Sequence, residues 1–189
     1  VHVMRKIVID GSNTTGFQRT MVIGIGGYLE AAGRKIGVQT ICLEEDAARL
    51  IEKRENLKVY HLDRLGVPLV EISLEPVTAT PEEIEEIALT LGRLLKASRR
   101  VARGLGTVRQ DVNISIEGGG IVEVKGVQKP DLVRKVVYFE VKRQLWLKEL
   151  ASILRQRGVK EEDLNVEPID VTHVFKETKS TIIQKAIKK

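Results

Sequence analysis

Apolar and β-branched residues alternate with polar residues over much of the first half of the chain, a pattern that predicts β-strands. Glycine-rich segments at 11–16 and 26–27 interrupt the pattern and predict turns. The strands expected from it cover residues 2–10, 20–25, 35–43, 59–62 and 69–73. Residues 44–50 then turn to helix-forming side chains, so a helix or an ordered loop is expected there.

The second half carries the signals of two long helices. Thr80 is placed as an N-cap, Pro81 as the first helical residue and Glu83 as the partner that completes a capping box. Apolar residues then recur at three- and four-residue steps, as on a helix that packs against a core. A second helix is expected from Pro130 to about Arg157, where Gly158 ends it.

A hairpin is predicted between these helices, with strands over 108–116 and 121–127 and a turn at the three glycines 118–120. A short strand at 166–174 and a helix at 180–189 complete the pattern. Strands, helix, hairpin and helix follow one another without regular βαβ alternation. The predicted fold class is therefore α+β, an antiparallel sheet with helices packed on one face.

The composition is that of a folded protein of the cell interior. The chain has 189 residues and 42% hydrophobic residues, enough to bury a core. It has 31 Lys and Arg against 26 Asp and Glu, for a net charge of +5, which suits a polyanionic partner but also many enzymes. Cys42 is the only cysteine, so no disulfide can form within the chain. The sequence has no long apolar run that would predict a membrane span. A cytoplasmic protein is expected, and Val1 in first position predicts a piece of a longer one.

Several acidic residues lie where structure alone does not require them. Glu71 interrupts an apolar strand, where it faces either solvent or a site. Glu44, Glu45 and Asp46 end the strand through Leu43. They form either a solvated helix start or carboxylate ligands for a hard cation such as Mg²⁺, which prefers oxygen.

The predicted hairpin carries polar residues at every second position. Asp111, Asn113 and Ser115 share one face of its first strand, and Glu123 and Lys125 share one face of its second. Such a face is either an exposed sheet surface or the polar floor of a nucleotide site, where cations meet phosphate oxygens and acids hold a metal.

Other nucleotide and catalytic patterns are missing from the sequence. The glycine segment 11–16 has neither a Walker A lysine nor the G-x-G-x-x-G spacing, so a P-loop or dinucleotide-binding fold is not expected. The three histidines have no metal-ligand spacing, and no nucleophile–base arrangement stands out.

Six motifs in order give the chain a family resemblance: I-D-G-S-N-T-T-G-F-Q-R-T (9–20), L-E-E-D-A-A-R (43–49), L-D-R-L-G-V-P-L-V-E-I (62–72), R-Q-D-V-N-I-S-I (109–116), V-E-V-K-G-V-Q (122–128) and Y-F-E-V-K-R-Q (138–144). They resemble the B/E family of tRNA-dependent amidotransferase subunits. Ala48-Arg49 and the 12–16 loop favour its archaeal E branch.

The resemblance implies a cradle-type catalytic domain over about residues 1–160, similar to the catalytic folds of glutamine synthetase and the guanidino kinases. Residues 161–189 would end the cradle or begin the next region. The implied reaction uses ATP and Mg²⁺ to phosphorylate the glutamate of Glu-tRNA(Gln) and then amidates it to Gln-tRNA(Gln). An asparaginase-like glutaminase, the D subunit, would supply the ammonia in a hetero-oligomer.

Roles for individual residues follow from the resemblance together with phosphoryl-transfer chemistry. The expected metal ligands are Glu71 with Glu44 or Glu45. The residues expected to neutralise phosphate charge are Arg64, Arg109 and Lys125. Asp111, Asn113 and Glu123 would complete the floor, through hydrogen bonds or a second metal.

Departures from the family pattern leave alternatives open. The family's E-I-H-x-Q-L segment, which carries further metal-site residues, is missing here, so this core is expected to be a poor enzyme alone. One alternative is a non-catalytic tRNA-binding or assembly module of the same fold. Another is a bacterial-type B subunit, which takes ammonia from an amidase-type partner. Clustered acids would favour the enzyme, and scattered acids the module.

Overall fold

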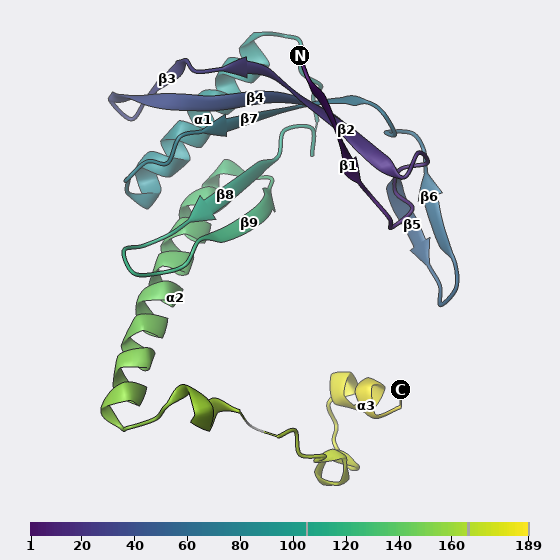
Figure 1. The fold of residues 1–189 in the computed structure, drawn as a ribbon, viewed down its shortest axis with the longest axis vertical. Helices are drawn as coiled ribbons and strands as arrows, with labels where there is room; N and C mark the ends of the chain where they lie inside the picture. The colour runs from purple at the N-terminus through teal and green to yellow at the C-terminus, as the bar shows by residue number, and fades with distance from the viewer. Residues whose placement is uncertain (105, 166, 189) are drawn as a thin grey trace. The chain divides into compact units, whose positions relative to one another are not determined.

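All the described strands pair antiparallel, and two long helices and a short one accompany them (Figure 1). The computed structural model describes residues 1–104, 106–165 and 167–188. The strands are β1 (Val3–Ile7), β2 (Phe17–Ile25), β3 (Tyr28–Ala31), β4 (Arg34–Glu45), β5 (Arg49–Lys53), β6 (Lys58–His61), β7 (Pro68–Leu74), β8 (Gln110–Ile114) and β9 (Val122–Val127). The helices are α1 (Pro81–Ala97), α2 (Pro130–Gln156) and α3 (Thr181–Ile187), with 3₁₀ turns at Glu161–Leu164 and Thr172–Phe175.

Strand β4 is the centre of the main sheet. Its twelve residues pair with β3 and β2 on one side and with β7 on the other, and β1 extends the sheet beyond β2. The β3–β4 turn uses positive φ at Ala32 (51°) and Gly33 (69°), a conformation suited to tight hairpins. This long strand brings the acidic end of β4 beside β7.

The predicted α+β class with antiparallel pairing is confirmed, but the described strands form three sheets rather than one. β5 pairs only with β6, and β8 only with β9, so each hairpin is a separate two-stranded sheet. A two-stranded sheet has little stability unless it packs against another element. For β8–β9, helices α1 and α2 supply that packing.

Helix α1 begins with the predicted capping box. The backbone N–H of Glu83 donates to the Thr80 hydroxyl (3.2 Å), and the backbone N–H of Thr80 donates to the Glu83 carboxylate (2.7 Å). The apolar side of α1 packs on the main sheet in a cluster of Leu29, Ala31, Ile36 and Ile87, lined by Ala32, Leu74, Val77, Ile84 and Leu91. This is the first of two small cores.

The second core joins the β8–β9 hairpin to the two long helices. Its buried members are Ile114, Val127, Val133 and Val137, and Ile84, Ala88, Val112, Val124, Val136 and Val141 pack against them. Ile84 of α1 contacts both cores. Helix α1 therefore fastens the hairpin to the main sheet.

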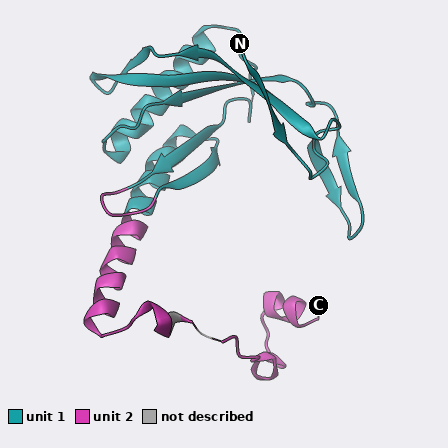
Figure 2. Cartoon of the chain, in the orientation of Figure 1, with its two compact units in different colours: residues 1–115, 121–141 teal, residues 116–120, 142–189 magenta. Residues whose placement is uncertain are grey.

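The chain divides into two compact units (Figure 2). The first holds residues 1–115 and 121–141, and the second holds 116–120 and 142–189. The first unit contains both cores and all the described strands. None of the helices among the described residues combines the length and the apolar character that crossing a membrane requires.

Two predicted elements differ from the structure. Of the two alternatives for 44–50, the helix is not formed, because residues 44–45 continue β4 and residues 49–53 form β5, and the ordered loop is confirmed only over residues 46–48. Between them the loop is tied to the fold by backbone bonds, from Asp46 N–H to the Val67 carbonyl (2.9 Å) and from Ala48 N–H to the Ser12 carbonyl (2.8 Å). Sheet pairing has overridden local helix propensity here.

The strand predicted at 166–174 is the second error. Residue 166 lies outside the described residues, and 167–174 contain no strand but the start of a 3₁₀ turn at Thr172–Phe175. None of the described strands pairs with this segment, so strand geometry would leave its backbone groups without ladder partners. Of the predicted terminal helix 180–189, the described part forms α3, and residue 189 lies outside the description.

The capping box gives a direct test of α1. Thr80→Ala removes the hydroxyl that accepts the Glu83 N–H, so the free energy of unfolding should fall by about 1 kcal/mol. Urea denaturation followed by circular dichroism measures the change. Thr78→Ala, two residues earlier at an exposed position, is the matched control and should change stability by less than about 0.5 kcal/mol. Equal losses in both variants would contradict the capping role.

Candidate functional site

The β8–β9 hairpin separates its polar and apolar side chains onto opposite faces. Val112, Ile114 and Val124 turn toward the helices, while Asn113 lies opposite Glu123 on the other face. Asp111 and Lys125 share the polar face, because each lies two residues from one of that pair. All four polar side chains are exposed, so this face is open to a ligand.

A β-bulge lies next to Lys125 in β9. Between the Gln110–Val127 and Val112–Val124 pairs, Asp111 lies opposite two residues, Lys125 and Gly126. Gly126 has φ of 70°, and its N–H donates to Asp111 Oδ1 (2.7 Å). Asp111 Oδ1 thus accepts a hydrogen bond from the bulge, and Asp111 Oδ2 faces Lys125.

Lys125 lies near two carboxylates of its own hairpin. Its Nζ lies 3.0 Å from Glu123 Oε1 and 3.8 Å from Asp111 Oδ2. The hydrogen bond to Glu123 and the charge of that carboxylate raise the pKa of Lys125, and the charges of Asp111 and Glu71 add to the rise. Glu71 belongs to β7 in the main sheet, so its charge reaches an ammonium on the separate hairpin.

Glu44 shares a sheet face with Glu71. The register places Cys42 opposite Glu71 and Leu69 opposite Glu44, and residues two apart on a strand share a face. The Glu44 carboxylate accepts a hydrogen bond from the Thr20 hydroxyl (3.2 Å), and Ser73 donates to Glu71 at the longer distance of 3.4 Å. Thr20 and Ser73 were not singled out in the sequence, because their contacts depend on side-chain positions that only the folded sheet reveals.

Glu45 lies on the opposite face of β4. There it forms a two-point ion pair with Arg19 and accepts a hydrogen bond from the Arg19 N–H (3.1 Å). The hydrogen bonds from Arg19 lower the pKa of the Glu45 carboxyl and keep it charged. Of the two alternatives for a metal ligand, Glu44 is therefore the one that the structure places with Glu71.

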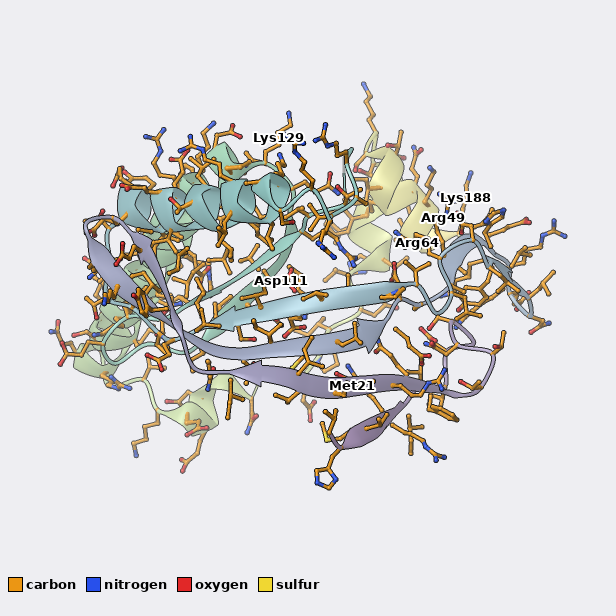
Figure 3. The ribbon with its side chains drawn as sticks, turned by 90° about the horizontal axis from the view of Figure 1, so that it is seen from above. Met21, Arg49, Arg64, Asp111, Lys129 and Lys188 are labelled. Carbon is orange, nitrogen blue, oxygen red and sulfur yellow. The ribbon has the colours of Figure 1, made fainter. Side chains whose placement is uncertain are left out.

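The two arginines predicted to meet phosphate lie apart from one another. Arg64 follows β6, with its Nε 3.7 Å from Asp46 Oδ2, and Figure 3 shows it well separated from Asp111. Arg109 directly precedes β8 and lies two residues before Asp111, so it is next to the hairpin. Lys125 is thus the predicted cation that the structure places among the acids.

The carboxylates on the sheet face could form part of a magnesium site. Within residues 1–104, 106–165 and 167–188, no group of three or more His, Cys, Asp or Glu side chains is arranged to hold a metal. Mg²⁺ commonly takes one or two carboxylates and completes its shell with water and substrate phosphates. Glu44 and Glu71 on one face could supply those carboxylates.

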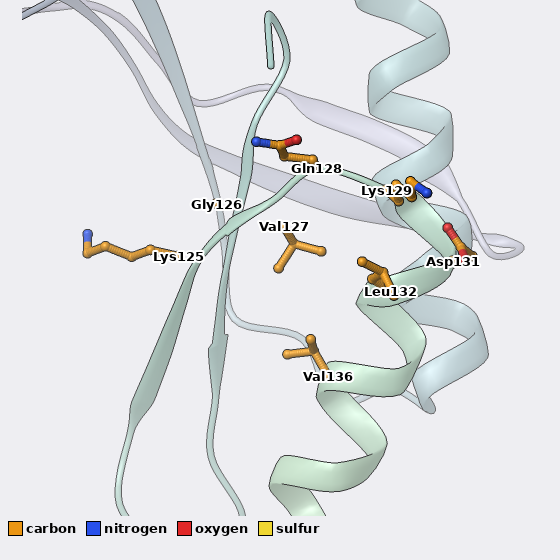
Figure 4. Close-up of a pocket in the computed structure, with 8 residues that line it drawn as sticks. All are labelled: Lys125, Gly126, Val127, Gln128, Lys129, Asp131, Leu132 and Val136. Atoms are coloured by element: carbon orange, nitrogen blue, oxygen red, sulfur yellow. The ribbon is translucent and has the colours of Figure 1, made fainter. Parts of the chain in front are cut away.

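A cavity of about 400 Å³ lies between the end of β9 and the start of α2 (Figure 4). Val127, Leu132 and Val136 turn toward it, and Gln128, Lys129 and Asp131 line its rim. Lys125 also borders it, but its side chain points away, toward the polar face of the hairpin. The cavity and the carboxylate face therefore lie on different sides of β9.

Sequence reasoning missed a second cavity, of about 520 Å³, between the β5–β6 hairpin and the loop at Asp10. The Tyr60 hydroxyl and Lys58 both donate to the Asp10 carbonyl, at 2.6 and 3.2 Å. Lys53 and Arg54 line the same cavity. The one signal in the sequence was the cluster of basic residues around 53–58, which the pattern of short strands obscured.

Similarity to known proteins decides the family. The model of the GatB/GatE catalytic domain matches residues 1–188. The chain belongs to the GatB/GatE catalytic domain family. The predicted B/E resemblance is therefore confirmed over essentially the whole chain.

Archaeal members of the family share about half of their residues with the chain over the region they match. Proteins named as the E subunit of glutamyl-tRNA(Gln) amidotransferase are 52% identical in Thermococcus gammatolerans over all of the chain and 54% identical in Archaeoglobus fulgidus over 97% of it. The protein of that name in Methanopyrus kandleri is 53% identical over the full chain. These names agree with the predicted E branch, and the chain spans about 30% of the length of each of these relatives.

The charge arrangement around Lys125 gives a test by NMR. The hydrogen bond from Lys125 to Glu123 is the largest cause of its raised pKa, so Glu123→Gln should lower that pKa toward the ordinary lysine value. Titration of ¹³Cε-labelled lysine measures the shift. Lys129, four residues further along, is the control signal and should not move. An unchanged Lys125 pKa in the variant would contradict the ion pair.

Proposed function

We propose that this chain provides the site at which ATP activates the glutamate of Glu-tRNA(Gln) for conversion to Gln-tRNA(Gln). The observation that carries the proposal is the contact of Lys125 with Asp111 and Glu123 on one exposed face of the β8–β9 hairpin. Membership of the GatB/GatE catalytic domain family supports it, as do relatives whose names specify this amidotransferase.

The proposed reaction has two steps. A γ-carboxylate oxygen of the glutamate attacks the γ-phosphorus of ATP, and the bond to ADP breaks to leave γ-glutamyl phosphate. The nitrogen of ammonia then attacks the carbonyl carbon, the bond to phosphate breaks, and the nitrogen loses a proton to give the amide. Phosphoryl transfer needs positioning and charge neutralisation more than covalent help from the protein.

The residues of the open face would divide this work. Lys125 and Arg109 would neutralise phosphate charge from the hairpin, and Arg64 would do so only for a substrate that extends to the β6–β7 loop. Asn113 and Asp111 would orient polar groups beside them. Glu44 and Glu71 would hold Mg²⁺, which would offset the negative charge of the phosphates.

The proposed partners follow from the same reaction. The second step consumes ammonia, so a D subunit, a glutaminase of asparaginase-like type, would release it next to this site. The working protein would be a cytoplasmic hetero-oligomer that also binds Glu-tRNA(Gln). Relatives named as E subunits favour this arrangement over a bacterial-type B subunit.

The alternative of a non-catalytic tRNA-binding module is less well supported. A binding surface requires basic residues but gains nothing from acids gathered on one face. Here Asp111 and Glu123 share Lys125, which places negative charge where an RNA backbone would be repelled. We also propose that the fold is similar to the catalytic folds of glutamine synthetase and the guanidino kinases.

Substitution of Glu71 tests the proposed chemistry. In a full-length E subunit, Glu71→Gln at the matching position keeps the shape of the side chain but removes the charge that would bind the metal. ADP formation dependent on Glu-tRNA(Gln) should fall at least about tenfold, measured as γ-³²P release in the presence of ammonia.

Glu45→Gln is the matched control, because Glu45 lies on the other face of the sheet in an ion pair with Arg19. Because that pair lies on the opposite face of β4 from the proposed metal ligands, activity should stay close to that of the unsubstituted protein. Full activity of the Glu71 variant, or equal loss in both variants, would contradict the assignment.

A further inference from the structure

Positive charge without acidic residues gathers between the middle of α1 and the start of β8. Residues 87–110 contain six Lys and Arg and no Asp or Glu. Five of the six are exposed, and we call them the 93–103 basic surface: Arg93, Lys96, Arg99, Arg100 and Arg103. The sixth, Arg109, precedes β8 and belongs to the proposed catalytic face.

These cations differ from several other arginines of the chain, which have acidic partners. Arg49, for example, pairs with Asp63 (3.0 Å). Within residues 1–104, 106–165 and 167–188, no member of the 93–103 basic surface forms an ion pair. An exposed cation of this kind can bind an anionic ligand without first breaking an ion pair.

Helix α1 ends inside this surface, with Arg99 in a left-handed conformation. The φ of Arg99 is 57°, which is uncommon for a residue with a side chain. The Arg99 N–H donates to the Lys96 carbonyl (3.2 Å), and the Arg100 N–H donates to the Ser98 hydroxyl (3.2 Å). The helix dipole favours cations in the last turn, where Lys96 lies, but its effect ends there. Helix stability therefore does not explain the charges of Arg99, Arg100 and Arg103.

We propose that the 93–103 basic surface binds the sugar–phosphate backbone of the tRNA substrate. The inference rests on the proposed function and deepens it, because it names the surface that holds the RNA. Cations spread over a helix turn and the loop after it suit a chain of phosphates better than the three adjacent phosphates of one nucleotide. The surface also has no carboxylate for the Mg²⁺ that accompanies a nucleotide. Because the loop leads directly into Arg109 and β8, RNA bound here lies next to the hairpin.

Helix α2 is the competing basic surface of the chain, but several of its cations already have partners. Arg134 Nε lies 3.5 Å from a Glu85 carboxylate oxygen, and Lys148 Nζ donates to the Glu117 carbonyl (2.6 Å). Binding of RNA there would have to disrupt these contacts. The 93–103 basic surface is therefore the stronger candidate, and α2 provides a control.

The experiment measures binding of a fluorescent tRNA(Gln) transcript by anisotropy over a series of salt concentrations, without ATP. Each phosphate that a cation neutralises releases about one counter-ion, so backbone binding weakens steeply with salt. Combined Arg99→Gln and Arg100→Gln should raise the Kd about tenfold or more at about 0.1 M salt, and reduce the slope of log K against log salt by about 2. Combined Arg155→Gln and Arg157→Gln removes the same charge from the end of α2 and is the matched control, with a change in Kd below about threefold.

A second variant keeps the test decisive if the change at the left-handed Arg99 prevents folding. Combined Arg93→Gln and Lys96→Gln lies within α1, where glutamine is a good helix former, and should weaken binding to a similar extent. An unrelated tRNA should bind as tightly as tRNA(Gln), because contacts to the backbone carry no sequence information. Excess ATP should not displace the RNA.

Four outcomes would overturn the proposal. They are an unchanged Kd and salt slope in both variants of the basic surface, an equal loss in the α2 control, displacement of the RNA by ATP, and absence of salt-dependent RNA binding by the unsubstituted chain. Since the measurement involves no ATP turnover or ammonia, its failure is distinguishable from failure of the activity assay of the Glu71 variant.

Discussion

The packing of Ile84 against both apolar cores is the contact on which the candidate site depends. Ile84 lies one turn into α1 and contacts the core under β3 and β4 as well as the core under the β8–β9 hairpin. Polar contacts of α1 also reach both the main sheet and the hairpin. Glu86 accepts the Ala32 N–H from the sheet side (3.1 Å), and the Ala88 carbonyl accepts from Gln110 at the start of β8 (3.2 Å).

This apolar packing, rather than the ion pairs, determines the geometry of the site. Exposed ion pairs such as Lys125–Glu123 contribute little to stability, because water screens their charges. Burial of an aliphatic side chain such as Ile87 or Val133 contributes about 1.5 to 3 kcal/mol. The cores therefore hold two separate sheets with their polar faces open, and the charges on those faces remain available to bind a ligand.

The elements that could be predicted from the sequence are those in which local signals and tertiary packing agree. The capping box at Thr80 and the alternation of Asp111 and Asn113 with the half-buried Val112 and the buried Ile114 both occur in the structure as expected. The extra strands β3 and β5 were missed because four- and five-residue strands next to glycines or charged residues carry little pattern of their own.

The grouping of site residues was only partly predictable. Alternation within one strand correctly put Glu123 and Lys125 on one face, because that requires only the period of two. It could not choose between Glu44 and Glu45, because the choice depends on which face of β4 meets Glu71 across the sheet.

The proposed function places a magnesium–nucleotide complex against Glu71 of β7 and the polar face of the β8–β9 hairpin. A crystal structure of the protein soaked with Mg²⁺ and a non-hydrolysable ATP analogue tests it most directly. We expect metal density bound to Glu71 and phosphate oxygens within hydrogen-bonding distance of Lys125. Nucleotide bound elsewhere on the chain, with Glu71 facing solvent and Lys125 still paired with Glu123, would contradict it.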